Sequence, residues 1–297
     1  MLKVNGLSKR FGDKEVLRGI DMHVPENSVF GFIGKNGAGK TTTMKAVLGL
    51  IKSDAGEIFV DGDRVSYGET QTNRKIGYLP DVPEFYPFMT AREYLMLCAD
   101  ITGIDKKNAL IRTDELLALV GLDGEKHRIG GYSRGMKQRL GIAQALFSRP
   151  RLLICDEPTS ALDPVGRKEI LDILSAASEQ TTVLFSTHIL SDVERICTDV
   201  AFLNEGRIAL NGKLADIKAR YSTDEYVIET ESAEGARALL DVFKCLRGEG
   251  DNLVGFKEEG GVVFDVLRFV SEKRIPVLRI ERKEPSLEAL FMEAVEK

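Results

Sequence analysis

Residues 34–41 read GKNGAGKT, a spacing of glycines, a lysine and a hydroxyl that suits phosphate binding. Glycines let backbone N–H groups curl around phosphate oxygens, because no Cβ stands in the way. We expect Lys40 to reach the β- and γ-phosphates and the Thr41 hydroxyl to ligate Mg²⁺. The other residues expected to touch the nucleotide here are Gly34, Asn36, Gly37, Ala38, Gly39 and Thr42. The segment predicts binding of a nucleoside triphosphate, against the alternative of a glycine-rich turn that binds nothing.

The neighbouring residues predict the elements that position this loop. An apolar run from Ser28 to Ile33 indicates a strand that enters it. A helix is expected to leave it, with an apolar face formed by Met44, Val47, Leu48 and Ile51. The positive N-terminal end of that helix would point at the phosphates.

A second apolar run, Leu152–Cys155, ends in two adjacent carboxylates. Successive side chains of a strand point to opposite sides, so the two acids face different surroundings. We assign Asp156 to the Mg²⁺ and Glu157 to the water that attacks the γ-phosphate. After a phosphate loop in the same chain, this pair predicts hydrolysis rather than binding alone.

These segments and four others together resemble the ATP-binding subunits of ABC transporters. Residues 160–163 match the D-loop of that family, His188 its switch histidine, and Phe11 the aromatic residue that stacks on adenine. Residues 132–140, YSRGMKQRL, stand in the place of its signature motif. The resemblance implies an α/β P-loop NTPase fold that binds ATP and Mg²⁺, with His188 as the γ-phosphate sensor. It also implies a homodimer around two ATP molecules, in which Ser133, Arg134 and Gly135 contact the partner's γ-phosphate.

Each of these residues also has a simpler interpretation. Asp163 before Pro164 is a good helix start, with the acid at the N-cap and proline at N1. Phe11 could belong to the core, and His188 could be an ordinary histidine at the end of a strand. Arg134 could be a solvated surface residue.

Two positions depart from the family pattern. The signature motif has Arg134 where its first glycine is usual and Met136 where its glutamine is usual. Asp81 replaces the glutamine that normally follows the strand at residues 75–79. A carboxylate suits Mg²⁺, so Asp81 is expected at the metal, with Glu84 as the alternative. These variants resemble the ABC-2-type branch of drug, bacitracin and sodium efflux ATPases, which implies a separate membrane permease and export.

The strand and helix pattern predicts two domains. Residues 1–213 form an ABC ATP-binding domain with a helical insert at about 86–145, and residues 214–297 form a small α+β domain. Within the insert, a capping box at Thr90–Glu93 predicts one helix, and another is expected after Asp114. In the second domain we expect strands at Glu225–Thr230, near Leu253 and at Val277–Arg282. Helices are expected at Gly235–Phe243 and after Pro285 and Ser286, the last one offering a stripe around Phe291 for dimer contact.

Composition limits the possible partners. The formal net charge is −5, and the excess of acidic residues falls in 214–297, which argues against nucleic-acid binding. The four cysteines are scattered and suggest neither zinc nor a disulfide framework. No apolar run is long enough to span a membrane, so the protein is expected at the cytoplasmic face, held there by the permease. The alternative is an ABC ATPase that acts on ribosomes or DNA without a membrane partner.

Overall fold

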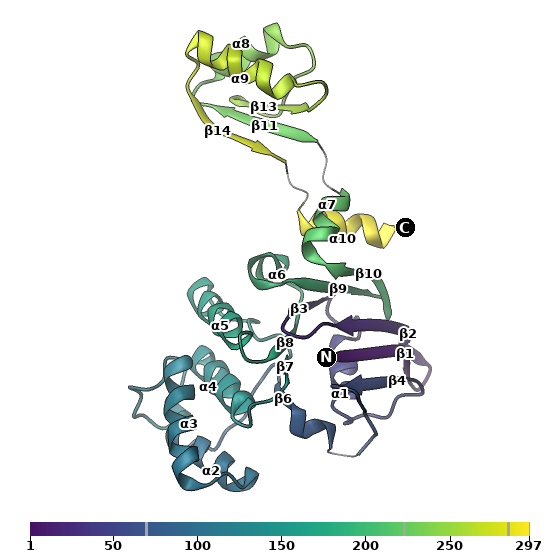
Figure 1. Ribbon diagram of the computed structural model, residues 1–297, viewed down its shortest axis with the longest axis vertical. Helices are drawn as coiled ribbons and strands as arrows, with labels where there is room; N and C mark the ends of the chain where they lie inside the picture. The colour runs from purple at the N-terminus through teal and green to yellow at the C-terminus, as the bar shows by residue number, and fades with distance from the viewer. Residues whose placement is uncertain (69–70, 222–223, 284–285, 297) are drawn as a thin grey trace. The chain divides into compact units, whose positions relative to one another are not determined.

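The computed structural model describes residues 1–68, 71–221, 224–283 and 286–296. The chain divides into two units (Figure 1). The first comprises Met1–Leu214 together with the residues from Glu293 on, and the second comprises Ala215–Met292. Pro285, expected to precede the last helix, lies outside the described residues.

A six-stranded sheet in the first unit positions the predicted site. Its order is β10-β9-β3-β8-β7-β6, and every neighbouring pair is parallel except β10 with β9. The strands span β3 Val29–Ile33, β6 Ile76–Leu79, β7 Leu152–Cys155, β8 Thr182–Thr187, β9 Asp199–Asn204 and β10 Arg207–Lys213. The carboxyl ends of the five parallel strands therefore meet at one edge, which is where ligands bind in such sheets.

One face of this sheet shares a core with an antiparallel sheet of order β2-β1-β4-β5. Its strands are β1 Leu2–Phe11, β2 Lys14–Val24, β4 Ala55–Val60 and β5 Asp63–Arg64, and helix α1, Lys40–Val47, packs into the same core. Along β7 the side chains alternate, so that Leu152 and Ile154 enter this core while Leu153 and Cys155 enter the other one. Both faces are buried, as the continuous apolar run of β7 predicts.

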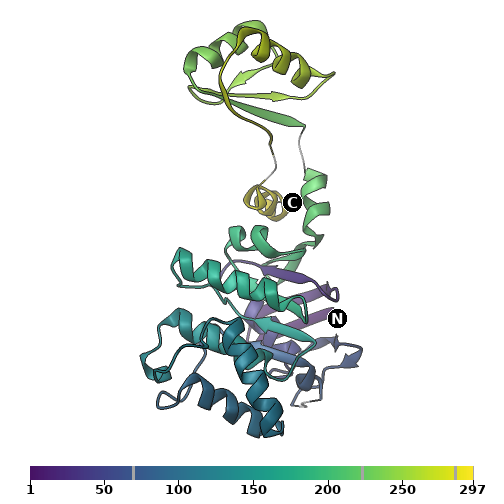
Figure 2. The same cartoon turned by 60° about the vertical axis from the view of Figure 1, so that its left-hand side comes forward.

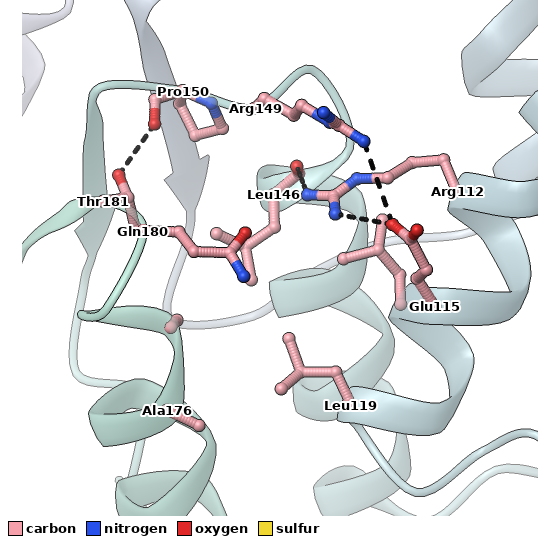
Figure 3. Close-up of a pocket in the computed structure, with 11 residues that line it drawn as sticks. Arg112, Glu115, Leu119, Leu146, Arg149, Pro150, Ala176, Gln180 and Thr181 are labelled. Atoms are coloured by element: carbon pink, nitrogen blue, oxygen red, sulfur yellow. Dashed lines mark hydrogen bonds and ion pairs between the residues drawn. The ribbon is translucent and has the colours of Figure 1, made fainter. Parts of the chain in front are cut away.

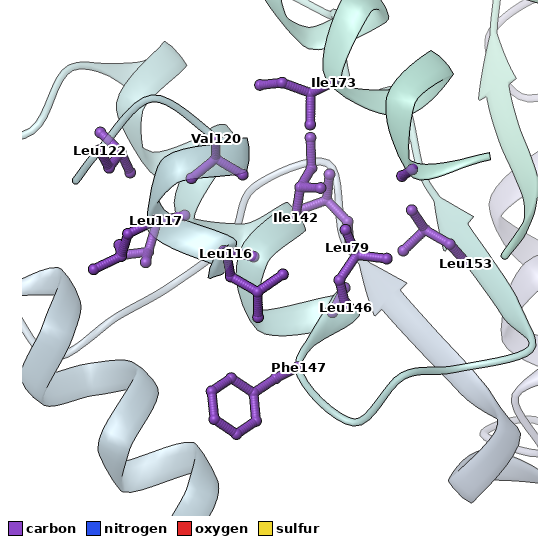
Figure 4. Packing of buried hydrophobic residues seen from close by; sticks show 14 of the residues in the cluster. Leu79, Leu116, Leu117, Val120, Leu122, Ile142, Leu146, Phe147, Leu153 and Ile173 are labelled. Atoms are coloured by element: carbon purple, nitrogen blue, oxygen red, sulfur yellow. The ribbon is translucent and has the colours of Figure 1, made fainter. Parts of the chain in front are cut away.

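The second core belongs to the helical insert, which lies between β6 and β7 (Figure 4). It contains α2 Ala91–Thr102, α3 Lys106–Leu119 and α4 Arg134–Leu146, with a short 3-10 turn, η2 Ile129–Gly131, before α4. Another 3-10 turn, η1 Thr72–Lys75, precedes β6 and lies outside the insert. Leu79 and Leu153 of the sheet pack against Ile142 of α4 and Ile173 of α5, Pro164–Ala177. Helix α6, Leu190–Ile196, follows β8.

The predicted start of α3 was wrong. The helix begins at Lys106 rather than after Asp114, because Asp105 caps it: Oδ1 accepts hydrogen bonds from the backbone N–H groups of Lys107 and Asn108, both at 3.1 Å. The capping box at Thr90 is confirmed. Helix α3 ends at Leu119, and Gly121 shortly after it adopts a φ of 62°, which is typical of a helix end.

In the second unit, helices α8, Ala233–Val242, and α9, Val262–Lys273, lie on one face of an antiparallel sheet (Figure 2). The sheet order is β12-β13-β11-β14, with β11 Glu225–Thr230, β12 Arg247–Gly248, β13 Leu253–Lys257 and β14 Val277–Arg282. Helices α7, Leu214–Tyr221, and α10, Leu287–Glu296, complete the chain. Sequence analysis missed α7 and α9. The Leu287, Leu290 and Phe291 side chains are already buried within one chain, so the stripe expected to make a dimer contact is not a free surface.

Gly77 of β6 provides a test of how the insert packs on the sheet. A Cβ at this position would overlap the backbone carbonyl of Ala145 in α4, and neither backbone can move without separating the two elements. We expect Gly77→Ala to lower the free energy of unfolding by about 1–3 kcal/mol, as overpacked cores do. Urea denaturation measures this. Gly124→Ala is the control, because its Cβ would meet nothing within 4 Å, and an equal loss in both variants would contradict the packing.

Candidate nucleotide-binding site

The loop between β3 and α1 has the geometry of a phosphate cradle. Gly37 and Gly39 have φ values of 81° and 113°, which favour glycine. A Cβ on Gly39 would also lie 2.7 Å from Cδ2 of Leu17. Only glycine fits at Gly39, and the chain can then enter α1 at Lys40 with its first N–H groups free for a ligand.

Lys40 is buried, with 6% of its side chain exposed, and its ammonium has three partners. Nζ donates hydrogen bonds to the carbonyl oxygens of Gly34, at 2.6 Å, and Lys35, at 3.3 Å. It also forms an ion pair with Oε1 of Glu157 at 3.0 Å. Oε1 accepts no hydrogen bond of good geometry from the described residues, so the contact between Lys40 and Glu157 is an electrostatic attraction.

The two carboxylates after β7 point in different directions, as predicted. Asp156 is buried, and its Oδ1 accepts a hydrogen bond of 2.7 Å from Oγ of Ser186. The same Ser186 oxygen accepts a hydrogen bond of 2.9 Å from the backbone N–H of Glu157. Glu157 adopts a φ of 49°, an uncommon backbone conformation for a residue other than glycine. One serine on the intervening strand β8 therefore fixes both acids.

His188 follows β8 and faces the other oxygen of Glu157. Its Nδ1 lies 2.9 Å from Oε2. A carboxylate can only accept, so Nδ1 carries the hydrogen in this contact. The Glu157 carboxylate thus lies between the Lys40 ammonium and the His188 ring. The ring is 43% exposed, which leaves it accessible to a ligand.

Asp81 lies at the end of β6, beside the insert and the D-loop. Its Oδ1 accepts hydrogen bonds from Oγ of Ser160, at 2.8 Å, and from Nη2 of Arg134, at 3.3 Å. Arg134 also donates to Ser160 at 3.2 Å. Arg134 is thus a surface residue, 44% exposed, that also pairs within its own chain.

A cavity of about 340 Å³ joins the phosphate loop to the strand ends. It is lined by Val16, Asn36, Gly37, Gly39, Lys40, Thr41, Thr42, Asp81, Asp156 and Glu157. The structure therefore brings together most of the predicted residues of the phosphate loop and all three predicted metal ligands. Glu84, the alternative to Asp81, does not line the cavity.

Several predicted residues lie elsewhere in the chain. Phe11 is 50% exposed, with Nζ of Lys9 over its ring at 5.2 Å from the centroid, so it is not a core residue. Ser133 caps α4, its Oγ accepting a hydrogen bond from the N–H of Met136 at 3.2 Å. Asp163 caps α5 in the same way, as its simpler interpretation predicts. Gly34 and Ala38 belong to the loop but do not line the cavity.

Val16, Ser160 and Ser186 were not predicted as site residues. A polar residue in the otherwise buried strand β8 is a signal that could have identified Ser186. Val16 gives no such signal, because its position depends on the pairing of β2 with β1.

The donor atoms around the cavity fit Mg²⁺. Thr41, Asp81 and Asp156 offer only oxygen atoms, the ligands that Mg²⁺ prefers. Within the described part of the chain, no three His, Cys, Asp or Glu side chains gather into a metal cage. Mg²⁺ is usually held by one or two carboxylates together with substrate phosphates, so a complete protein cage is not needed.

Buried groups behind the cavity stay neutral. Burial, together with the negative charge of Asp156, raises the pKa of Tyr78 to about 12. Burial raises the pKa of the Cys155 thiol well above its usual range, and the Asp156 charge adds to the effect. The charge at the site therefore comes from Lys40 and the carboxylates.

Comparison with known proteins identifies relatives for both units. Residues 17–160 match the ABC transporter family, and residues 212–295 match the C-terminal domain of DrrA1-3-like ATP-binding proteins. The chain is 37% identical over 302 residues to the uncharacterized ABC transporter ATP-binding protein YxlF of Bacillus subtilis, covering 99% of both chains. It is 36% identical to the bacitracin transport ATP-binding protein BcrA of Bacillus licheniformis, covering 99% of this chain and 97% of that one.

Solved structures agree with this similarity. An ATP-binding subunit of an ABC transporter superposes with a TM-score of 0.67 and 32% identity. The match covers 74% of this chain and 93% of that structure.

Ser186 provides a test of how the two carboxylates are held. Ser186→Ala leaves Asp156 and the N–H of Glu157 without this partner in a buried place, so we expect unfolding to become easier by about 1–3 kcal/mol. We also expect kcat to fall, because Glu157 loses the hydrogen bond that fixes its backbone. Urea denaturation and steady-state phosphate release measure the two effects. Ser175→Ala on the exposed side of α5 is the control, and parental kcat in Ser186→Ala would refute the positioning role.

Proposed function

The chain belongs to the family of ABC transporter ATP-binding proteins, and we propose that it pairs head to tail with a second copy around two Mg-ATP. It is an ATPase. We further propose that the dimer drives a separately encoded ABC-2-type permease as an exporter. The observation that supports the catalytic assignment best is the contact of Glu157 with the buried Lys40 and the partly exposed His188, at the edge where the parallel strands end.

Lys40 binds the terminal phosphates in this proposal. Its ammonium already lies at the start of α1, held by the Gly34 carbonyl. A γ-phosphate in the cavity offers this ammonium more negative charge than the Glu157 carboxylate does. It therefore competes with Glu157 for Lys40.

Glu157 then acts as general base. Once its ion pair with Lys40 is broken, the Glu157 carboxylate can accept a proton from the attacking water. His188 stays close enough to orient that water or to contact the γ-phosphate. Asp156 keeps its hydrogen bond from Ser186 while it lies beside the phosphates. Thr41, Asp156 and Asp81 would hold Mg²⁺, which would offset the negative charge of the phosphates during hydrolysis.

Residues 133–135 would contact ATP bound to the second copy. They start α4, where backbone N–H groups and a positive helix end favour an anion. Each γ-phosphate would then touch both copies, and its loss on hydrolysis would let them part. Phe11 is proposed to stack on adenine, and its half-exposed ring is accessible for this.

The segment from Pro80 to Pro87 is proposed to transmit closure to the permease. Val82 and Tyr86 in this segment, and Phe88 directly after it, are 62%, 53% and 62% exposed. Solvent-exposed apolar side chains in one short segment are typical of a protein interface. No helix formed by the described residues is long and apolar enough to cross a membrane. The proposed location is therefore the cytoplasmic face of the membrane, through the permease.

The relatives favour transport over the alternative. Of the two relatives named above, BcrA is described as a bacitracin transport ATP-binding protein. This similarity supports export of a drug-like compound by the present protein. An ABC ATPase acting on ribosomes or DNA has no support among the relatives described above. The residues from 215 to 292 are proposed to be an accessory domain of the type found in DrrA-like proteins.

Replacing the lysine tests phosphate binding. We expect Lys40→Ala to weaken ATP binding about 10- to 100-fold, because a charge-assisted hydrogen bond contributes about 1.5–3 kcal/mol. Isothermal titration with Mg-ATP measures the affinity. Lys45→Ala, exposed in the last turn of the same helix, is the control. Unchanged affinity for Mg-ATP in Lys40→Ala would show that Lys40 does not bind the phosphates.

Replacing the glutamate separates hydrolysis from binding. Glu157→Gln should lower kcat by about 10²–10⁴, the usual contribution of a general base. ATP should still bind, and an ATP-dependent dimer should accumulate, measurable by light scattering. Glu169→Gln on α5 is the control. Normal hydrolysis in Glu157→Gln would show that another group is the base, and a strictly monomeric variant at saturating Mg-ATP would argue against the dimer.

A further inference from the structure

A second cavity, of about 460 Å³, opens between the helical insert and α5 (Figure 3). It lies between α3, the turn from α4 to β7, and the C-terminal end of α5. It shares no lining residue with the nucleotide cavity. Its size falls within the range of about 300–1,000 Å³ that is usual for small-ligand sites.

One end of this cavity carries two arginines that share one carboxylate. Nη1 of Arg112 lies 3.2 Å from Oε2 of Glu115, and Nη2 of Arg149 lies 3.9 Å from the same oxygen. The three side chains leave one positive charge uncompensated. Arg149 is 74% exposed and can turn toward a ligand at the cost of its long contact with Glu115 alone.

Arg112 is held in place and still has a free donor. Only 13% of its side chain is exposed, and Nη2 donates a hydrogen bond of 2.8 Å to the carbonyl of Leu146. Its Nε is buried and has no hydrogen-bond partner among the described residues. Burial lowers the pKa of Arg112, and the nearby charge of Arg149 lowers it further. An oxyanion at this position would satisfy the free N–H and reduce the repulsion between the guanidinium groups.

The other end of the cavity is apolar. Leu119 and Ala176 lie there, away from the arginines, and Leu116 and Ala177 continue the wall into the core of the insert. An apolar wall opposite a cationic end matches a molecule with one charged head and a short hydrocarbon body.

We propose that this cavity binds a small amphiphilic anion, with its oxyanion at Arg112 and Arg149 and its apolar body against Leu119 and Ala176. A carboxylate and a phosphate monoester share this chemistry. Because α3 and α4 belong to the insert and α5 packs beside the sheet, the bound molecule would bridge the two parts of the first unit.

Titration of the full-length protein with octanoate and with octyl phosphate tests the proposal. We expect one molecule of at least one of the two to bind per chain, and the tighter one identifies the preferred head group. Octanol lacks the negative charge, and acetate lacks the hydrocarbon body. Each should bind at least about tenfold more weakly than the octyl anions. One charge-assisted contact or a few buried methylenes changes the affinity by that much. Failure of both octyl anions to bind at millimolar concentration, or equal binding of octanol, would overturn the proposal.

Two variants locate the binding. Arg149→Gln removes one charge at an exposed position and should weaken octanoate binding about tenfold, while Arg74→Gln, also exposed, should not. Ala176→Phe fills the apolar end and should abolish binding, while Ser175→Phe places the same ring on an adjacent face of α5 and should leave binding intact. Parental affinity in Ala176→Phe would show that octanoate binds elsewhere.

Discussion

The nucleotide site depends on the ammonium of Lys40, a positive charge buried at the start of α1. A buried cation is stable only with compensating partners. In this chain the partners are the Gly34 and Lys35 carbonyls and the Glu157 carboxylate. A γ-phosphate must compete with Glu157 for the same ammonium. Arrival of the phosphate and release of the base are therefore coupled by one charge.

The sheet order makes this coupling possible. Strand β8 lies between β3, which leads into the phosphate loop, and β7, which carries the acids. Ser186 of β8, and His188 directly after this strand, can therefore reach Asp156 and Glu157. The positive φ of Glu157 costs about 1–3 kcal/mol in general, and the hydrogen bond from its N–H to Ser186 offsets part of that.

Asp81 extends the site toward the insert. Its carboxylate faces the nucleotide cavity and also pairs with Arg134 at the start of α4. Ion pairs exposed to this extent contribute only about 0–1 kcal/mol. A metal ion or a phosphate can therefore displace either partner at little cost, and motion of α4 can accompany nucleotide binding.

Short sequence patterns correctly predicted those loops, strands and helix starts whose structure is determined by neighbouring residues. The phosphate loop, the buried strands β3 and β7, and the capping box at Thr90 have short-range patterns. The start of α3 was wrong because the cap at Asp105 precedes a polar first turn with few apolar residues. Helix α9 was missed, since its start at Gly261 has no side-chain cap.

The contacts between distant segments could not be predicted in this way. The roles of Ser186 and of Ser160 follow from strand order and loop packing, which bring together residues 29 and 79 positions apart. The same holds for Arg134: its type was noted from the sequence, but its pairing with Asp81 is a property of the fold.

The competition for Lys40 is tested most directly by the affinity of Glu157→Gln for a non-hydrolysable ATP analogue. Removing the negative charge of Glu157 frees the ammonium, so we predict that the variant binds the analogue about tenfold more tightly than the parent, with a smaller gain for ADP, which lacks the γ-phosphate. Equal or weaker binding of the analogue by the variant would contradict the coupling of phosphate arrival to release of the base.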